Sequence, residues 1–324
     1  NIEYQQNLGS LIKLIILRIE INNNTLLKIM EIIPFDKRIG FIWYNGEFVE
    51  WQNATTHVLN HGLHYGSCVF EGLRVYGEKI FKLKEHTERL FHSADRMGIE
   101  IPFSQEIINQ AQEETIQKMN IKYGYVRPVV WRGSEMMAVS AQKNKINVAI
   151  ATWEWPSYFT KEDRLKGISL QTAIWKRPAP DTIPTDAKAA GLYMICTLSK
   201  HEAEKNGYAD ALMLDYKGRV SESTGSNIFF VIGGEIHTPI PDCFLDGITR
   251  KTVIGLAKSQ GINVIERDIY PDEIKNADEI FLTGSAVEVT PVGKIDDMDY
   301  KVGEITSKIS NLYMKEVDPN YQSS

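Results

Sequence analysis

Two short hairpin signals constrain the fold of this chain more than any other feature of its sequence. Asn45-Gly46 separates two apolar runs near the start of the chain, and Gly233-Gly234 separates two others much later. Two-residue connections of asparagine and glycine supply the positive φ angles of the tight turns that join antiparallel strands. Both halves of the chain are therefore expected to contain antiparallel sheet.

Further strands and helices are expected around these hairpins. Apolar runs bounded by turn residues predict strands at about 41–44, 47–51, 69–76, 79–83, 123–132, 146–153, 168–175, 211–214, 219–221, 227–232, 235–238, 262–267 and 279–283. Apolar residues at helical spacing, with capping residues at the ends, predict helices at about 84–97, 105–119, 190–206, 249–259 and 304–316. Strands and helices that mix without a regular βαβ repeat predict the α+β class.

The length of the chain predicts two domains. Its 324 residues exceed the roughly 100–200 residues of a typical single domain. The stretch Trp153–Lys166, with Pro156 and a charged tail, is the best candidate for a linker. We therefore expect a small N-terminal domain at 30–152, an interdomain loop at 153–166 and a large C-terminal domain at 167–324.

The first 29 residues differ in composition from the rest. Isoleucine, leucine and asparagine supply 18 of residues 1–29, whereas alanine, valine, proline and aspartate are absent. Lys13 and Arg18 interrupt the apolar stretch and no small-residue cleavage site follows, so this segment makes a poor signal peptide. Because the first methionine is Met30, we interpret residues 1–29 as upstream sequence and expect translation to begin at Met30. The alternative is a true N-terminal helix that docks on the body of the protein.

Composition argues, in part weakly, against several classes of function. The 36 basic and 42 acidic residues give a net charge of −6 and an isoelectric point near 5.7, which argues against nucleic acid and anionic membrane surfaces as partners. No run approaches the roughly 18 apolar residues of a membrane-spanning helix. Cys68, Cys196 and Cys243 are odd in number and far apart, which favours a reduced, cytoplasmic protein over a disulfide framework or a metal site.

Four short segments in the second half of the chain carry residues suited to catalysis, and the first surrounds Lys188. This lysine stands among alanine and glycine residues after a loop rich in proline, and it lacks the charged neighbours of an ordinary surface lysine. A crowded or buried lysine favours its neutral amine and can act as a nucleophile or base. Taken alone, a lysine is still far more often a surface charge.

The other three segments are turns that also have an ordinary structural interpretation. Residues 221–227 connect two expected strands, and residues 282–288 leave a strand through Gly284-Ser285, so each could be a solvated turn. Residues 246–250 begin an expected helix, whose free backbone N–H groups suit a phosphate, although a simple N-cap explains them equally well. No G-x-G-x-x-G or G-x-x-x-x-G-K-[ST] loop occurs, which argues against the common nucleotide-binding folds.

The order and spacing of these segments resemble the branched-chain amino acid aminotransferases of the pyridoxal-phosphate-dependent, fold-type IV (class IV) family. The resemblance extends from about Phe41 to Tyr313. Besides the four segments, it includes His64-Tyr65-Gly66, Val69-Phe70-Glu71-Gly72-Leu73-Arg74, Glu85-His86 with Arg89-Leu90, Tyr125-Val126-Arg127-Pro128 and Ala179-Pro180. It implies a fold-type IV enzyme with two α/β domains, pyridoxal 5'-phosphate as cofactor, and amino transfer between L-leucine, isoleucine or valine and 2-oxoglutarate.

The resemblance assigns seven residues to the cofactor. It implies that Lys188 forms the Schiff base and carries the substrate's Cα proton. Glu222 is implied to pair with the pyridine nitrogen and keep it protonated, and Tyr193 to bond the phenolic oxygen. The phosphate is implied to bind the Arg89 side chain, the Ile248 and Thr249 backbone and the Ser285 hydroxyl. Judged locally, Arg89 could instead form an i,i+4 pair with Glu85.

A second set of residues is implied to select the substrate, which must include both an apolar side chain and the charged side chain of glutamate. Tyr125 and Arg127, two apart on one face of an expected strand, are implied to bind the α-carboxylate and the γ-carboxylate. The other implied residues are an aromatic wall, a glycine that leaves room, backbone N–H groups for the α-carboxylate, and a loop that reaches a neighbouring subunit: Tyr65, Phe70, Trp155, Tyr158, Gly72, Ser285, Ala286, Met137 and Val139. Each aromatic residue could also be ordinary core.

The remaining implications concern partners and close alternatives. The resemblance implies a homodimer or homohexamer that acts on small amino acids and 2-oxo acids in branched-chain amino acid biosynthesis, without a metal. A D-amino acid aminotransferase or an aminodeoxychorismate lyase of the same fold would keep Lys188 and Glu222 but change the substrate residues. Tyr125-Val126-Arg127 and the Trp155…Tyr158 pair favour the branched-chain, L-specific branch. A cofactor-binding or scaffold protein without catalysis is the alternative outside enzymes.

Overall fold

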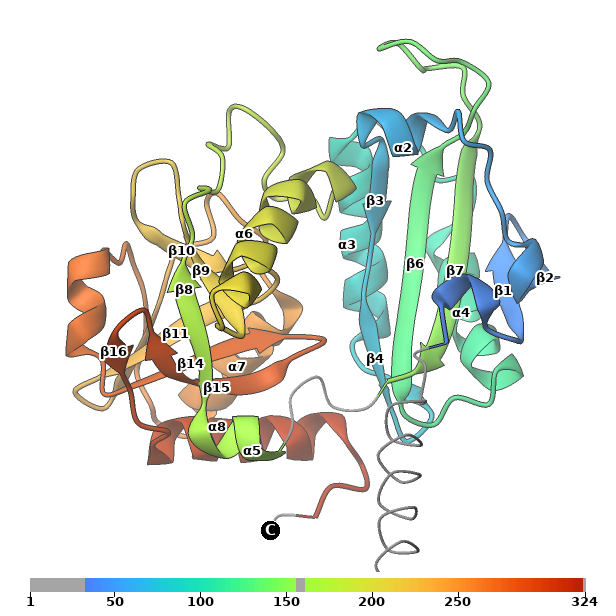
Figure 1. Ribbon diagram of the computed structural model, residues 1–324. Coiled ribbons are helices and arrows are strands. Elements are labelled where there is room, and N and C mark those ends of the chain that lie inside the picture. Colours follow the sequence, from blue (N-terminus) through green and yellow to red (C-terminus); the bar gives the residue numbers. More distant parts are fainter. Residues whose placement is uncertain (1–32, 156–160, 323–324) are drawn as a thin grey trace, which may run out of the picture.

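The structure is a computed structural model that describes residues 33–155 and 161–322. The predictions for residues 1–29 and for Tyr158 therefore lie outside the described residues. Within the described ranges the strands form two sheets that share no strand, one before and one after residue 160. Figure 1 shows the sheets in two lobes, with α3 (Leu83–Arg96) and α6 (Tyr193–Lys205) between them. The predicted α+β class is confirmed, and we propose that the two lobes are the two domains.

The first lobe contains, among the described residues, an antiparallel sheet of seven strands. Their order is β2-β1-β7-β6-β4-β5, with β3 also paired to β6. The strands are β1 (Phe41–Tyr44), β2 (Glu47–Glu50), β3 (Cys68–Phe70), β4 (Leu73–Tyr76), β5 (Lys79–Ile80), β6 (Gly124–Arg132) and β7 (Ile146–Glu154). Asn45 and Gly46 both have positive φ and connect β1 to β2, as the hairpin signal predicts. Helices α3 and α4 (Gln105–Lys118) pack against this sheet.

The second lobe contains, in the same described ranges, a mixed sheet of nine strands. They are β8 (Ile168–Thr172), β9 (Asp210–Leu214), β10 (Val220–Ser223), β11 (Asn227–Ile232), β12 (Glu235–Thr238), β13 (Val264–Glu266), β14 (Glu279–Gly284), β15 (Glu288–Ile295) and β16 (Met298–Asp299). The order is β10-β9-β8-β15-β14-β11-β12-β13, with β16 paired to β15. An added pairing of Glu222 with Asn227 joins β10 to β11 and closes six strands into a ring.

Helices cover the second sheet on more than one side. Helix α6 packs against β9, whereas α7 (Ile248–Ser259) and α8 (Glu304–Val317) pack together and against β14 or β15. Phe229 and Phe281 stack at 5.0 Å between ring centroids in the core beneath α7 and α8. This face of the sheet thus has an apolar core that it shares with α7 and α8.

Strand β15 is the main element that the sequence prediction misses. Pro291 and Gly293 interrupt its apolar pattern, and such residues normally indicate a turn. In the structure Pro291 pairs with Phe281 of β14, and β8 joins the opposite edge only from Val292 onward. The missing proline N–H thus falls outside the ladder with β8. A Cβ at Gly293 would lie only 2.3 Å from the Lys166 carbonyl oxygen, so glycine is required for this close approach.

Both described ends of the predicted linker contain residues of regular elements. Trp153 and Glu154 complete β7, where they pair with Tyr125 and Gly124 of β6. At the other end, α5 (Lys161–Lys166) consists mostly of good helix formers and packs against β15. The predicted linker at 153–166 therefore includes the end of a strand and a short helix.

The remaining elements are single turns that strand and helix periodicity does not detect. They are α2 (His61–Tyr65), η1 (Phe35–Lys37), η2 (Trp51–Asn53), η3 (Ala190–Leu192) and η4 (Pro271–Asn276). Within residues 33–155 and 161–322, none of the helices combines the length and the apolar character needed to cross a bilayer.

Candidate active site

Lys188 lies on an extended segment that connects the second lobe to the first. Ala187 and Ala189 are buried in the core of the first lobe, whereas Lys188 is only half-buried, because alternate side chains of extended chain point to opposite sides. The Phe70 N–H donates to the Lys188 carbonyl oxygen at 3.1 Å, and the Lys188 N–H donates to Ser93 Oγ at 2.9 Å. The small residues beside Lys188 therefore anchor it on β3 and α3.

The Lys188 amine is held by aromatic side chains. Its Nζ donates a hydrogen bond to Tyr193 Oη at 2.6 Å. The same atom lies 5.0 Å from the Phe70 ring centroid and 5.1 Å from that of Tyr193. Tyr193 is the first residue of α6, which fixes its direction. The amine is thus oriented by a hydroxyl and two rings, as a nucleophile or proton carrier requires.

Glu222 lies where β10 and β11 close the ring. Its side chain is buried, with Arg177 Nε 3.4 Å from Oε1 and Asn227 Nδ2 donating to Oε2 at 3.4 Å. Burial raises the pKa of Glu222 to about 7, although the charges of Arg177 and Lys188 oppose this shift. A cationic N–H group bound in the adjoining cavity would stabilise the ionised form of this buried carboxylate.

A cation and a helix N-terminus meet at the other end of the cavity. Arg89 projects from α3, and α7 begins after Gly247 without any side-chain cap. A Cβ at Gly247 would lie 2.1 Å from Asn227 Oδ1, so glycine is needed there. Backbone N–H groups at a helix N-terminus, together with a guanidinium, suit a phosphate. Arg89 does not pair with Glu85, which instead contacts Lys82 Nζ at 2.8 Å.

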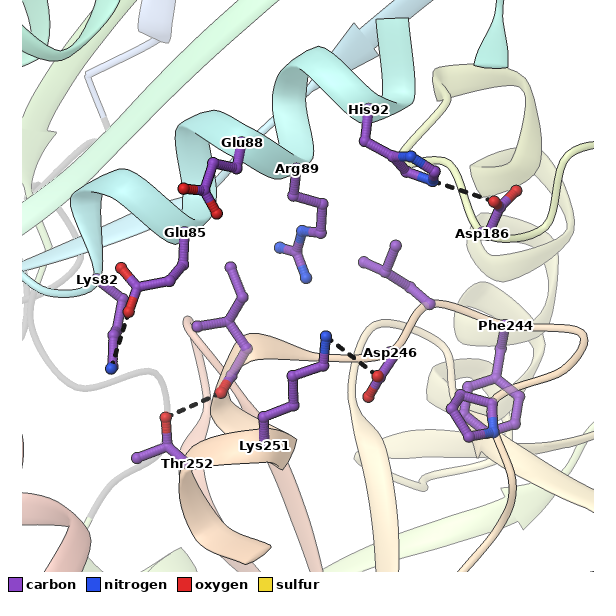
Figure 2. Close-up of a pocket in the computed structure, with 13 residues that line it drawn as sticks. Lys82, Glu85, Glu88, Arg89, His92, Asp186, Phe244, Asp246, Lys251 and Thr252 are labelled. Carbon is purple, nitrogen blue, oxygen red and sulfur yellow. Dashed lines mark hydrogen bonds and ion pairs between the residues drawn. The ribbon is translucent and has the colours of Figure 1, made fainter. Parts of the chain in front are cut away.

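One cavity between the lobes brings together all seven residues predicted for the cofactor. Its lining includes Arg89, Lys188, Tyr193, Glu222, Ile248, Thr249 and Ser285, and also Gly72, Tyr125 and Ala286 of the substrate set. A second, outer cavity shares Arg89 and Ile248 with it. Figure 2 shows this outer cavity, in which Glu85, Arg89 and His92 of α3 face Asp246 and Lys251 across the gap.

Phe70, Arg127 and Trp155 are also predicted for the substrate; they do not line this cavity but form a connected wall with Tyr125, which does. Arg127 donates to Tyr125 Oη at 3.3 Å, and its guanidinium lies 4.7 Å from the Phe70 ring centroid. The Tyr125 and Trp155 ring centroids are 4.6 Å apart. A Cβ at Gly72 would lie 1.7 Å from Tyr125 Oη. The Tyr125 hydroxyl therefore occupies the space that the absence of a side chain at Gly72 leaves.

Three other predicted substrate residues belong neither to the lining of this cavity nor to the wall beside it. Tyr65 is half exposed and stacks on His61 at 4.5 Å between ring centroids. Met137 and Val139 lie on the loop that follows β6, with 38% and 86% of their surfaces exposed. The predicted roles of Tyr65 in the aromatic wall and of Met137 and Val139 in the pocket of a neighbouring subunit therefore stay predictions.

Comparisons with known proteins agree with this geometry. The family model for amino-transferase class IV matches residues 68–295. The chain belongs to the class IV aminotransferases. Among curated class IV relatives, the branched-chain-amino-acid aminotransferase of Pseudomonas aeruginosa is 42% identical over 283 residues, which are 85% of this chain and 92% of that protein. The enzyme of the same name from Escherichia coli K12 is 37% identical over 286 residues, 86% and 93% of the two chains.

Solved structures of class IV aminotransferases share the fold. The branched-chain aminotransferase of Thermoproteus uzoniensis with norvaline has a TM-score of 0.83 at 35% identity, covering 86% of this chain and 95% of that one. The branched-chain amino acid aminotransferase of Thermobaculum terrenum in its PLP-bound holo-form has a TM-score of 0.79 at 29% identity, with coverage of 86% and 94%. The fold-type IV prediction is confirmed.

The structure adds polar residues to which the sequence prediction gave no role. Arg177 and Asn227 contact Glu222, and Glu71 contacts Arg89. The position of Glu71 inside an apolar run could have indicated its role, because a buried carboxylate requires a buried cation or hydrogen-bond donor as its partner. Asn227 directly follows a strand-connecting turn, which offers no comparable signal.

Proposed function

We propose that this class IV aminotransferase moves the amino group between L-leucine, L-isoleucine or L-valine and 2-oxoglutarate, with pyridoxal 5'-phosphate as cofactor. The observation that carries the proposal is the convergence of the Lys188 amine, the Glu222 carboxylate and the Arg89 guanidinium on one cavity. The names of the curated relatives support it, as do the norvaline and the cofactor of the two similar structures.

The donor set of the cavity fits this cofactor. Thr283 lines the cavity, and its buried Oγ1 has no hydrogen-bond partner among the described residues, so it is available to a ligand. Arg89 with the α7 N-terminus suits the phosphate, Tyr193 the phenolic oxygen and Glu222 a protonated ring nitrogen. When bound, the cofactor supplies an aldehyde that holds the amino group and a ring that accepts electrons from Cα.

Different residues of the cavity would have different roles in the reaction. Lys188 Nζ would accept the Cα proton and deliver it to the aldehyde carbon of the cofactor, acting as base and then as acid. Tyr193 Oη, 2.6 Å from Nζ, orients this amine. Glu222 would hold a proton on the pyridine nitrogen, and the charges of Arg177 and Lys188 favour the ionised carboxylate against the effect of burial. Ser285 and Ala286 offer backbone N–H groups to the α-carboxylate of the substrate.

The wall formed by Phe70, Tyr125, Arg127 and Trp155 supports the choice of substrate. Aromatic surface from Phe70 and Trp155 suits a branched aliphatic side chain, whereas Arg127 and Tyr125 Oη suit the second carboxylate of glutamate. One pocket can thus accept both partners of the exchange. The free, buried Cys196 and Cys243 support a reducing compartment, and we place the enzyme in the cytoplasm.

A direct comparison of two amino donors tests the proposed activity. We expect amino transfer from L-leucine to 2-oxoglutarate to exceed transfer from D-alanine by about 10²-fold or more, because the pocket binds a larger apolar side chain and one stereoisomer. Product 2-oxo acids are measured by chromatography, and a visible spectrum recorded before and after adding L-leucine reports the cofactor. Faster transfer from D-alanine, or a colourless protein after incubation with pyridoxal 5'-phosphate, would contradict the proposal.

We also propose that the active unit is at least a homodimer. Val139 on the loop after β6 is 86% exposed, and Val58 and Leu63 beside α2 are 70% and 71% exposed. Figure 1 shows this loop projecting beyond both sheets, on the side where α2 lies. Apolar side chains presented together at one end of a molecule are typical of a protein interface. The placement is consistent with Met137 and Val139 serving the pocket of a neighbouring subunit.

The dimer proposal predicts a coupled loss of assembly and activity. We expect the protein to sediment at twice 36.9 kDa or more, and we expect Val139→Asp to raise the dissociation constant of the dimer at least about tenfold, because a charge would be buried at the interface. Sedimentation velocity over a concentration series measures this, with Lys143→Asp on the same exposed loop as a control. A fully active monomer at micromolar concentration would refute the proposal.

A further inference from the structure

Glu71 lies behind the Arg89 guanidinium and is completely buried. It follows β3 directly, and its two oxygens accept hydrogen bonds from Arg89 Nε at 2.6 Å and from a terminal Arg89 nitrogen at 2.9 Å. The Gly72 N–H also donates to this carboxylate at 3.2 Å, and His86 Nδ1 lies 2.7 Å from it. The carboxylate therefore has four donors and no contact with water.

These contacts determine which edge of the guanidinium is available to a ligand. A guanidinium has five N–H donors in one plane, and Glu71 takes one from Nε and one from a terminal nitrogen. The three remaining N–H groups lie on the edge away from Glu71. Arg89 lines both the inner cavity and the outer one, and Figure 2 shows it projecting from α3 into the gap in front of Lys251.

The charge state of the cluster is fixed by its surroundings. Although burial alone would raise the pKa of Glu71, the charge of Arg89 and the hydrogen bonds from Arg89 and His86 hold it well below the ordinary range. Burial lowers the pKa of His86 despite the opposing effect of Glu71. Neutral His86 then donates its Nδ1–H and adds no charge. Glu71 and Arg89 thus form a permanent ion pair whose geometry does not change with pH near neutrality.

We propose that Glu71 and His86 are positioning residues that fix the Arg89 guanidinium in the orientation that binds the cofactor phosphate. The proposal rests on the cofactor assigned under Proposed function. Glu71 opposes the charge of Arg89, so it does not strengthen the attraction for an anion at a distance. Its contribution is to hold a long, flexible side chain in one rotamer, so that less conformational entropy is lost when the phosphate binds.

The experiment compares two ligands that differ only in the phosphate. Dissociation constants of pyridoxal 5'-phosphate and pyridoxal are measured by absorbance titration of the full chain after removal of cofactor. The bond to Lys188 is common to both ligands and cancels in the ratio of the two constants. We expect Glu71→Gln to lower the preference for the phosphorylated ligand at least about tenfold, since an amide cannot accept both Arg89 donors. Arg89→Lys should lower it as well.

Matched variants separate positioning from a general structural effect. Glu85→Gln lies on the surface of the same helix and should leave the preference unchanged. His86→Ala should lower the preference, whereas His86→Asn should retain it, because the asparagine amide can donate from the place of Nδ1. If the Glu71→Gln variant does not fold, the comparison of His86→Ala with His86→Asn tests the proposal on its own.

The outcomes distinguish this inference from the proposed function. A wild-type protein that binds neither ligand would refute the proposed function itself. If the wild type prefers the phosphorylated ligand but Glu71→Gln or His86→Ala weakens both ligands equally, the cluster supports only the fold and the positioning proposal is overturned. An unchanged preference in both variants would overturn it in the same way.

Discussion

Replacing Lys188 with alanine is expected to lower the turnover of L-leucine by at least about 10³-fold, because the variant loses the group that carries the Cα proton. The fold should persist, since Lys188 is half-buried and its side chain makes one hydrogen bond among the described residues, to Tyr193. The free energy of unfolding is therefore expected to change by about 1 kcal/mol or less.

Single-turnover kinetics and denaturant unfolding on the same preparation check this expectation. Lys258→Ala, on the exposed face of α7, is the matched control and should leave both turnover and stability unchanged. Substantial turnover by the Lys188→Ala variant would show that another base performs the proton transfer. Loss of turnover together with loss of the fold would show that Lys188 is a structural residue.

Replacing Glu222 with glutamine is expected to separate activity from stability. Turnover should fall by about 10²–10³-fold, because a neutral amide cannot hold a proton on the pyridine nitrogen as a carboxylate does. The cofactor-free protein should nevertheless become more stable at alkaline pH. Active sites often carry such a cost, because the charge that catalysis needs is unfavourable in a buried place.

The direction of the pH effect follows from the pKa of Glu222. Burial raises this pKa to about 7 in the folded protein, from a value of 4.5 for an ordinary glutamate. Between these values the folded state holds a proton that the unfolded state has released, so the stability of the wild type falls as the pH rises through this window. Glutamine does not titrate and escapes this loss.

Thermal unfolding of the cofactor-free wild type and Glu222→Gln at pH 5 and pH 8 measures the effect. We expect the free energy of unfolding of the variant, relative to that of the wild type, to be higher at pH 8 than at pH 5 by on the order of 1–3 kcal/mol. Glu235→Gln, on a strand of the same sheet, serves as a control for a half-buried carboxylate. A stability difference independent of pH would show that Glu222 is already ionised at pH 5.

Local features of the fold could be predicted from the sequence because they depend on neighbouring residues. Asn45-Gly46 and Gly233-Gly234 form tight turns at positive φ, and Ser104 caps α4 by accepting a hydrogen bond from the Ile107 N–H. Strand β15 could not be predicted in this way. Its proline is tolerated only because β8, from a distant part of the chain, joins the sheet one residue later.

The candidate site shows the same division. The resemblance of the sequence to the class IV aminotransferases predicts Lys188, Tyr193 and Glu222 as cofactor-binding residues, and the three line one cavity. The contacts that orient them were not predicted, because Arg177 reaches Glu222 and Glu71 reaches Arg89 only after strands and helices have packed. Motifs therefore identified the groups that react, whereas the three-dimensional fold was needed to identify the groups that hold them.

Gly72 and Tyr125 constrain each other's evolution. Any side chain at position 72 would place a Cβ 1.7 Å from the Tyr125 hydroxyl oxygen and 2.6 Å from the ring carbon that carries it. A larger residue at position 72 becomes acceptable only after Tyr125 has been replaced by a smaller side chain, so the order of the two substitutions decides which variants are viable. Attempts to reshape this pocket by directed evolution must therefore change both positions together or begin with Tyr125.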